Sequence, residues 1–234
     1  MSMDESIDIA TRPLIVETAE DPEYSCLLLH GGGGDPLEFK SLIQAISPPH
    51  VGIRYVLPYA PEIRLTLFSG HLMRAWFDVT DDNLELHQDI AGIEASTNTV
   101  LSLIDMEYAS GIAYEKIIIG GFSQGGAIAL LAALRLRASL AAAFCLSGYL
   151  PLGDNMQTIA SIESRKTPIF IGHGAHDELV PVHLAASACL TLRNLGFDVV
   201  GEEYPIGHQV SMGELRLLWD WLSQVIQLKG SCSI

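Results

Sequence analysis

The sequence predicts an α/β protein with a mostly parallel β-sheet and helices on both of its faces. Short apolar runs rich in β-branched residues alternate along the chain with longer segments of helical periodicity. One such run, residues 117–119, leads into a glycine-flanked serine at position 123 and then into a stretch of small residues typical of a helix. This strand–turn–helix unit is the build of a nucleophile elbow, which presents a serine hydroxyl at the C-terminal edge of a sheet.

The first half of the chain contains strand signals and two helix signals. The expected elements, in order, are a polar lead-in over 1–12, an edge strand at 14–16, an acidic turn at 19–23, a buried strand at 25–30 ending in four glycines, a helix at 39–46 stopped by Pro48 and Pro49, a strand at 54–57 and a long helix at 84–108. The inner face of the long helix is read from residues three and four apart: Leu86, Ile90, Ile93, Thr97, Val100 and Ile104.

The second half continues the same alternation after the elbow. The expected elements are strands at 141–146, 168–171 and 199–204, a helix at 184–195 ending at Gly196, and a final helix opened by a capping box formed by Ser211 and Glu214. Strands that alternate with helices form crossover units, whose functional sites lie at the C-terminal ends of the strands. We expect one domain over residues 1–234, with 1–12 a frayed lead-in and 229–234 a tail.

Composition excludes several classes of partner. The formal net charge of −15 argues against binding nucleic acid or an anionic membrane surface, and the apolar stretches are too short and interrupted for membrane insertion. The first residues are acidic and lack the basic and apolar regions of a signal peptide. The four cysteines are scattered without a paired motif, which is typical of free thiols. We therefore expect a cytoplasmic protein.

A serine nucleophile needs a histidine base, and the base needs a carboxylate to orient it. Asp177 directly follows the strand at 168–171, and His208 lies between the last strand and the last helix. The order Ser123, Asp177, His208 and the position of both loops are what this chemistry requires. The alternatives are Asp154, Glu178 or Asp198 as the carboxylate and His173 or His183 as the base; Asp198 precedes a strand, and neither histidine fits the last loop.

Two glycine- or histidine-rich stretches admit other interpretations. His30 is followed by Gly31–Gly34, whose backbone N–H groups suit an oxyanion hole; a phosphate-binding loop would need a Gly-Lys-Ser/Thr ending or a GxGxxG pattern, which are missing here. His173, His176 and Asp177 resemble part of a metal site, but no further cluster with ligand spacing accompanies them. These residues therefore do not predict a metal site.

Several motifs together resemble the phospholipase/carboxylesterase family, which includes acyl-protein thioesterases, lysophospholipases and small bacterial carboxylesterases. They run in the same order from about residue 24 to 226: Leu-His-Gly-Gly-Gly-Gly-Asp at 29–35, Val-Leu-Pro-Tyr-Ala-Pro at 56–61, Trp-Phe-Asp at 76–78, Gly-Gly-Phe-Ser-Gln-Gly-Gly at 120–126, His-Gly-x-x-Asp at 173–177 and Tyr-Pro-x-Gly-His at 204–208. The resemblance implies an α/β-hydrolase fold with no large cap domain, no cofactor and no metal.

The resemblance also implies roles for individual residues. Ser123, Asp177 and His208 would form the catalytic triad, and Gly32 and Gln124 would donate the oxyanion N–H groups. The apolar stretch 65–76 would contact the acyl group, although by composition it suits core packing equally. The implied substrate-binding residues are Leu65, Phe68, Met73, Trp76 and Val180.

Two departures from the family pattern concern the pocket. Gly32 stands where the family usually has leucine, and Arg74-Ala75 replaces Pro-Ser before the Trp-Phe-Asp motif. The first makes the site roomier or its oxyanion loop looser, and the second puts a cation near the expected pocket mouth.

The predicted function is hydrolysis of carboxylic esters or acyl thioesters of small-molecule or acylated substrates through an acyl-enzyme. Three alternatives stay open: another hydrolase on the same fold, such as a dienelactone-type hydrolase or a peptidase; a non-catalytic ligand-binding protein; and a metal-dependent hydrolase. A homodimer also stays open, because exposed strand or loop surface could support one.

Overall fold

The computed structural model describes residues 12–47, 51–81 and 83–230 of the chain. A central sheet of seven strands runs in the order β1-β3-β2-β6-β7-β8-β9, and all neighbours are parallel except the antiparallel pair of β1 and β3. Its strands are β1 (Leu14–Glu17), β2 (Tyr24–Leu29), β3 (Ile53–Leu57), β6 (Ile117–Phe122), β7 (Ala142–Leu146), β8 (Ile169–Gly174) and β9 (Val199–Tyr204). The predicted α/β-hydrolase arrangement of the sheet is confirmed.

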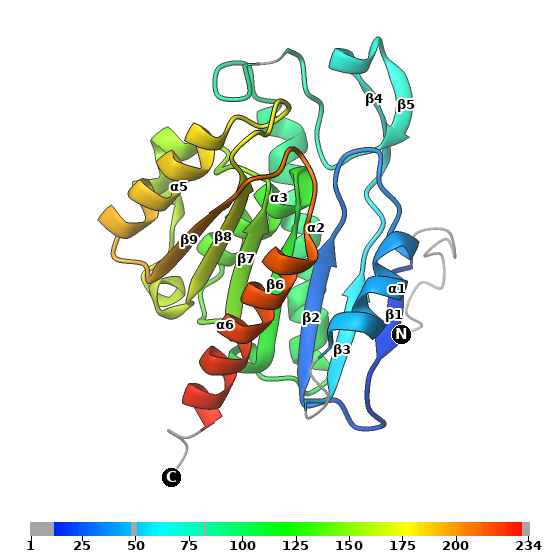
Figure 1. Ribbon diagram of the computed structural model, residues 1–234, viewed down its shortest axis with the longest axis vertical. Helices are drawn as coiled ribbons and strands as arrows, with labels where there is room; N and C mark the ends of the chain where they lie inside the picture. The colour runs from blue at the N-terminus through cyan, green and yellow to red at the C-terminus, as the bar shows by residue number, and fades with distance from the viewer. Residues whose placement is uncertain (1–11, 48–50, 82, 231–234) are drawn as a thin grey trace, which may run out of the picture.

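Helices cover both faces of the sheet (Figure 1). They are α1 (Leu37–Ile46), α2 (Ile90–Ala109), α3 (Gln124–Arg135), α4 (Met156–Ile159), α5 (Val182–Asn194) and α6 (Met212–Gly230). The apolar side chains of α2, α3 and α5 belong to one buried cluster, and those of α1 and α6 belong to a second cluster on the opposite face. Successive side chains of a strand point to opposite faces of the sheet, so the strands contribute residues to both clusters.

The long helix starts later than the sequence predicts. Asp89 caps it by accepting a hydrogen bond from the N–H of Gly92, so α2 begins at Ile90 and residues 84–88 form a loop. Leu86 and Ile90, assigned to the buried face, are 70% and 59% exposed. The rest of the predicted face, beginning with Ile93, is buried.

The other helix ends are close to their predicted positions. The capping box is present, since the N–H of Glu214 donates to Ser211 Oγ and the N–H of Ser211 donates to Glu214 Oε2. Gly196 follows α5 with a φ of 87°. Pro48 and Pro49, expected to stop α1, lie outside the described residues.

A second, two-stranded sheet was not predicted. β4 (Glu62–Leu65) and β5 (His71–Arg74) pair antiparallel and are joined through a 3₁₀ turn at Thr66–Phe68; together they form the β4–β5 hairpin. The hairpin stands at the end of the sheet where the parallel strands finish (Figure 1). No described helix is long and apolar enough to cross a membrane.

Candidate active site

Ser123 lies in the sharp turn between β6 and α3. Its backbone angles, φ 56° and ψ −126°, are unusual for a residue with a side chain, and such conformations cost on the order of 1–3 kcal/mol. The flanking glycines are required by packing, because a Cβ at Gly121 would lie 2.5 Å from the carbonyl oxygen of Leu29 and one at Gly125 would overlap the same carbonyl. The end of β2 therefore presses directly on the turn that holds the serine.

Ser123, His208 and Asp177 come together from three separate loops. His208 Nε2 lies 3.0 Å from Ser123 Oγ, and His208 Nδ1 lies 2.7 Å from Asp177 Oδ2. In the neutral tautomer that these contacts favour, the Nδ1–H donates to the carboxylate and Nε2 accepts the serine proton. The phenyl ring of Phe122 packs against the imidazole of His208, with the ring centroids 4.8 Å apart.

The Asp177 carboxylate is buried and fixed at both oxygens. While Oδ2 faces His208, Oδ1 accepts hydrogen bonds from the N–H groups of Leu179 and Val180, at 2.9 and 2.8 Å. Of the alternative carboxylates, Glu178 is exposed and Asp198 lies at the opposite end of β8 and β9.

His173 is a positioning residue that the sequence analysis considered only as a base or a metal ligand. Its buried Nε2 lies 2.7 Å from the carbonyl oxygen of Val180 and 3.4 Å from Asp177 Oδ2, so it ties the start of the Asp177 loop to its end. Its place at the end of β8, four residues before the aspartate, was the available signal. The described residues contain no group of three or more potential metal ligands.

The glycine loop after β2 is held in place by the side chain of His30. Nδ1 of this buried histidine lies 2.7 Å from the Gly31 carbonyl oxygen, and Nε2 accepts a hydrogen bond from the N–H of Ala60. Burial lowers the pKa of His30, which keeps the ring neutral. Trp76 fixes the backbone from the other side, because its Nε1–H donates to the His30 carbonyl oxygen.

Gly32 and Gln124 lie next to each other beside Ser123. A Cβ at Gly32 would lie 3.2 Å from Gln124 Oε1, and a Cβ at Gly31 would lie 3.3 Å from that of Ser123. The Gln124 side chain accepts from the N–H of Trp76 and donates to the carbonyl oxygen of Phe77, both at 3.1 Å. As the first residue of α3, Gln124 has a backbone N–H without an intrahelical acceptor. The backbone N–H of Gln124 is thus available as a hydrogen-bond donor beside the serine.

A cavity of about 190 Å³ opens beside Ser123 and His208. Its walls are largely apolar: Leu65, Leu67, Phe68, Phe77, Val79, Leu84, Phe122, Tyr149, Leu179 and Val180, together with Gly31, Gly32 and Gln124. The residues from the β4–β5 hairpin and those after Asp177 close it from different sides.

Three of the five predicted substrate-binding residues, Leu65, Phe68 and Val180, line this cavity, whereas Met73 and Trp76 do not. Trp76 is instead buried beneath the glycine loop, where it donates to the His30 carbonyl. Arg74 is also absent from the cavity wall; its guanidinium donates to the Ala60 carbonyl oxygen and lies over the ring of Tyr59. Tyr149, which follows β7, was not predicted, although its place after a parallel strand was a usable signal.

The parallel sheet with one antiparallel edge, the serine turn and the loop histidine define an α/β-hydrolase. The model of the phospholipase/carboxylesterase family matches residues 10–226, so the chain belongs to that family, as predicted, and is a carboxylic ester hydrolase.

Known relatives agree with this membership. Acyl-protein thioesterase 1 of Neurospora crassa is 34% identical over 222 residues, covering 91% of each chain. A probable carboxylesterase of Oryza sativa is 33% identical and covers 94% of this chain and 83% of its own. The crystal structure of Zea mays acyl-protein thioesterase 2 superposes with a TM-score of 0.81 at 27% identity, covering 92% of this chain and 99% of its own.

Proposed function

We propose that the protein hydrolyses carboxylic esters or acyl thioesters through an acyl-enzyme on Ser123, with His208 as the base and Asp177 as the residue that orients it. The observation that carries this proposal is the continuous chain of contacts from Ser123 Oγ through the imidazole to Asp177. The names of the relatives, acyl-protein thioesterase and carboxylesterase, support the same bond types.

In the acylation step, His208 takes the proton of Ser123 as the serine oxygen attacks the carbonyl carbon. The negative charge that develops on the carbonyl oxygen is stabilised by the N–H groups of Gly32 and Gln124, aided by the N-terminal end of α3. Protonated His208, stabilised by Asp177, then donates its proton to the leaving alcohol or thiol. Water repeats the cycle on the acyl-enzyme and releases the acid.

The acyl group of the substrate would enter the cavity beside Ser123. The apolar lining of this cavity supports that assignment. We also infer that the chain acts as a single domain in the cytoplasm. The single domain is supported by the seven-stranded sheet, which has one apolar cluster on each face. The cytoplasmic location is supported by Cys26, Cys145 and Cys189, which are all buried free thiols.

Replacing the nucleophile tests the proposal directly. Ser123→Ala should lower kcat for a p-nitrophenyl ester by on the order of 10⁴-fold or more, because no other group can form the acyl-enzyme. It should also abolish labelling by a fluorophosphonate, with the label mapping to Ser123 in the unmodified protein. Ser102→Ala, at an exposed position of α2, serves as the matched control and should leave both readouts unchanged. Turnover near that of the unmodified protein in Ser123→Ala would refute the mechanism.

A further inference from the structure

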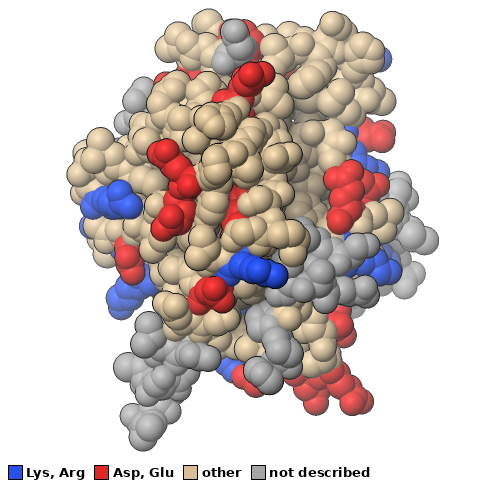
Figure 2. All heavy atoms as spheres, viewed as in Figure 1, with Lys and Arg blue, Asp and Glu red and all other residues tan. Residues whose placement is uncertain are grey.

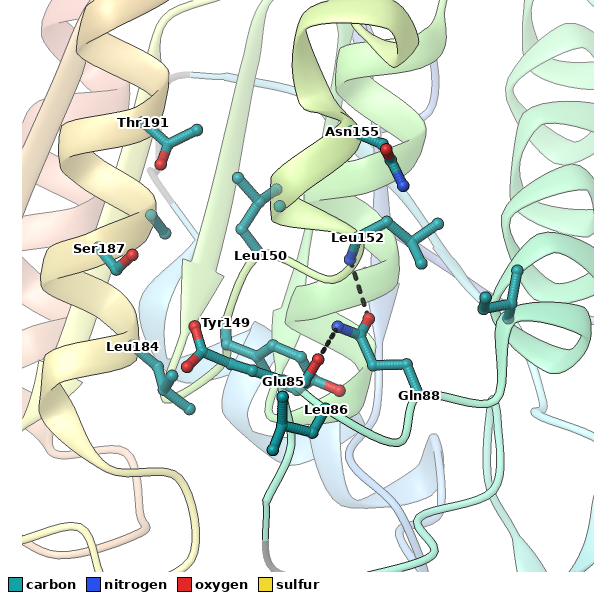
Figure 3. Close-up of a pocket in the computed structure, with 13 residues that line it drawn as sticks. Glu85, Leu86, Gln88, Tyr149, Leu150, Leu152, Asn155, Leu184, Ser187 and Thr191 are labelled. Carbon is teal, nitrogen blue, oxygen red and sulfur yellow. Dashed lines mark hydrogen bonds between the residues drawn. The ribbon is translucent and has the colours of Figure 1, made fainter.

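A larger cavity, of about 410 Å³, lies between α5, the segment that follows β7 and the loop that precedes α2. Figure 3 shows Ser187 and Thr191 of α5 on one side of it, Leu152 and Asn155 on the other, and Glu85 with Gln88 along the loop. It is more than twice the volume of the cavity beside Ser123, and the mechanism described above does not use it.

The larger cavity adjoins the reaction centre. Tyr149 lines both this cavity and the one that contains Ser123 and His208. A third cavity, of about 300 Å³, shares Leu84 with the Ser123 cavity and shares Glu85 and Leu184 with the larger cavity. The larger cavity is thus separated from the Ser123 cavity by no more than a shared wall residue, which places it within reach of the part of a substrate that extends beyond Ser123.

The boundary of the larger cavity is fixed by Gln88. Its Oε1 accepts a hydrogen bond of 2.9 Å from the N–H of Leu152, and its Nε2 donates one of 3.0 Å to the carbonyl oxygen of Glu85, as the dashed lines in Figure 3 show. Because one side chain joins the loop before α2 to the segment after β7, the two walls keep their separation without a ligand. The cavity is preformed.

Its polar side chains have unused hydrogen-bonding capacity. On α2, the hydroxyls of Thr97, Thr99 and Ser102 donate back to the carbonyl oxygen four residues earlier. Within the described part of the chain, the hydroxyls of Ser187 and Thr191 and the side chains of Asn155 and Glu85 donate or accept no hydrogen bond; Ser187, Asn155 and Glu85 are exposed and face solvent at the cavity wall. Hydroxyl and amide groups both donate and accept, which matches the hydroxyls of a ligand, and the ring of Tyr149 adds an apolar surface.

Charge restricts the ligand further. Glu85 is the single acidic residue, and no Lys or Arg is found, among the described residues that line the larger cavity. The chain as a whole carries a formal net charge of −15, and Figure 2 shows acidic side chains spread over the face that α1 and α6 cover, opposite the face of α5. A phosphate or carboxylate placed in this cavity would have no cation to pair with and would lie near a carboxylate.

We propose that the larger cavity is the leaving-group subsite and that it takes an uncharged, hydroxyl-rich alcohol, such as a sugar or another polyol, esterified to the acyl group. This inference rests on the proposed ester hydrolysis and adds the class of alcohol. The ester C–O bond breaks, the acyl group passes to Ser123 and then to water, and the polyol oxygen takes its proton from His208. A phosphorylated alcohol is disfavoured at the same site.

The test compares three butyrate esters that share one acyl group: p-nitrophenyl butyrate, 6-O-butyrylglucose and 6-O-butyrylglucose 1-phosphate. The unmodified protein should cleave the neutral sugar ester with a kcat/KM about tenfold or more above that of the phosphorylated one, the size of one well-placed interaction. Equal values for the two sugar esters would overturn the inference.

Two variants locate the effect. Ser187→Trp fills the cavity and should lower kcat/KM for 6-O-butyrylglucose by about tenfold, the loss of one or two hydrogen bonds. The change for p-nitrophenyl butyrate should be less than about twofold, because its activated leaving group carries no hydroxyl and departs without hydrogen bonds from the cavity. Ala186→Trp, at the adjacent exposed position of α5 that lines no part of this cavity, is the matched control and should change neither. Glu85→Lys should reduce the preference for the neutral sugar ester by about tenfold, by supplying the missing cation.

The outcomes separate this inference from the proposed function. If p-nitrophenyl butyrate is cleaved and Ser123 is labelled, but Ser187→Trp affects the aryl and sugar esters equally, the leaving-group subsite is wrong while the esterase proposal stands. If the protein cleaves none of the three esters and Ser123 takes no fluorophosphonate, the proposed function fails, and the inference fails with it.

Discussion

Asp177 shows how the backbone determines the chemistry of one side chain. Two consecutive N–H groups, of Leu179 and Val180, occupy Oδ1, so only Oδ2 faces His208. The carboxylate can therefore neither rotate nor exchange its oxygens without breaking hydrogen bonds. This restraint fixes which imidazole nitrogen carries the proton.

The restraint makes Asp177→Asn a specific probe. The two backbone donors require the amide oxygen of asparagine at the Oδ1 position, which turns its NH₂ group toward His208 Nδ1. The histidine then takes the opposite tautomer and cannot accept the serine proton. We expect kcat for a p-nitrophenyl ester to fall by roughly 10³- to 10⁴-fold, as for the equivalent change in a serine protease, with little change in thermal stability.

The neighbouring Glu178 provides the matched control for Asp177→Asn. Its side chain is exposed and is one residue away, so Glu178→Gln removes a similar charge near the site without touching His208. Its kcat should stay within about twofold of the unmodified value, since a screened surface charge has little effect. A fall of less than tenfold in Asp177→Asn would remove Asp177 from the mechanism.

Among the elements, the β4–β5 hairpin contributes the outer wall of the cavity beside Ser123. Leu65, Leu67 and Phe68 reach the cavity from the hairpin and its 3₁₀ turn, and Phe68 is still 49% exposed. Asp78 anchors the turn, since its carboxylate accepts from both the N–H and the hydroxyl of Thr66. Few buried contacts hold the tip itself, so it is the part of the cavity most easily reshaped.

Phe68 lines the cavity beside Ser123 and is half exposed, so it lies at the outer end, where it would limit the length of the acyl chain that the cavity admits. Phe68→Ala should open the outer end and raise the ratio of kcat/KM for dodecanoate over butyrate p-nitrophenyl esters by about fivefold or more, since each buried methylene contributes about 0.8 kcal/mol. Leu72→Ala is the control, because Leu72 lies on β5, is 59% exposed and does not line the cavity. An unchanged ratio in Phe68→Ala would show that Phe68 does not limit the chain.

The two strands of the hairpin, unlike those of the main sheet, could not be predicted from the sequence. The central strands β2, β6, β7 and β8 were predictable because each is a short, buried and mostly apolar run. The positions of the loops after β6, β8 and β9 follow from the strands that they leave. The hairpin strands are mostly exposed, with Leu65 the buried exception, so no clear alternation identifies them. The start of α2 is set by the cap at Asp89. The apolar pattern in the sequence extends further toward the N-terminus, to Leu86, so it places the start of the helix too early.

Within the site, the triad residues could be predicted from the sequence, whereas the residues of the pocket could be predicted only in part. Ser123, Asp177 and His208 could be selected because strand order and loop position restrict where such side chains meet. Met73 and Trp76, predicted to bind substrate, do not line the cavity beside Ser123, because sequence alone does not tell which side of a hairpin or loop a side chain occupies. The larger cavity has no motif at all: its walls come from three segments that are distant in the sequence.

In the molecule as a whole, a buried carboxyl group lies where α6 meets the sheet. Glu214 is fully buried and a Cβ at Gly172 of β8 would lie 2.6 Å from its Oε1. Burial raises the pKa of Glu214 to about 7, although the hydrogen bond from the Ser211 N–H acts in the opposite direction. Oε1 has no hydrogen-bond partner within the described residues.

This group links the stability of the fold to pH. The unfolded chain releases the Glu214 proton near its usual pKa of about 4.5, whereas the native protein holds it up to about pH 7. Between these values the native state binds more protons, so the free energy of unfolding decreases as pH rises and levels off above about pH 7. The loss is at most about 3.5 kcal/mol, since one pKa unit corresponds to about 1.4 kcal/mol.

Glu214→Gln should remove this dependence, because glutamine keeps an acceptor for the Ser211 N–H but does not titrate. Urea unfolding at about pH 5 and about pH 8 should show that the stability of the variant relative to the unmodified protein increases with pH. Asp220→Asn, at an exposed position of the same helix, should show no such increase. A stability difference between Glu214→Gln and the unmodified protein that is equal at both pH values would contradict the assignment.

The burial of α3 has a consequence for how the enzyme moves. Every residue of this helix from Gln124 to Leu134 is buried, and the helix packs against strands and α2. We expect the hydrogen-bonded amides in the interior of this helix to exchange with deuterium only when the whole fold opens, and those of the β4–β5 hairpin to exchange through local opening. Ser123 would then be attached to a slowly exchanging part of the molecule, while the hairpin wall of the cavity exchanges faster. Substrate range can consequently change by reshaping the hairpin without disturbing the support of the nucleophile.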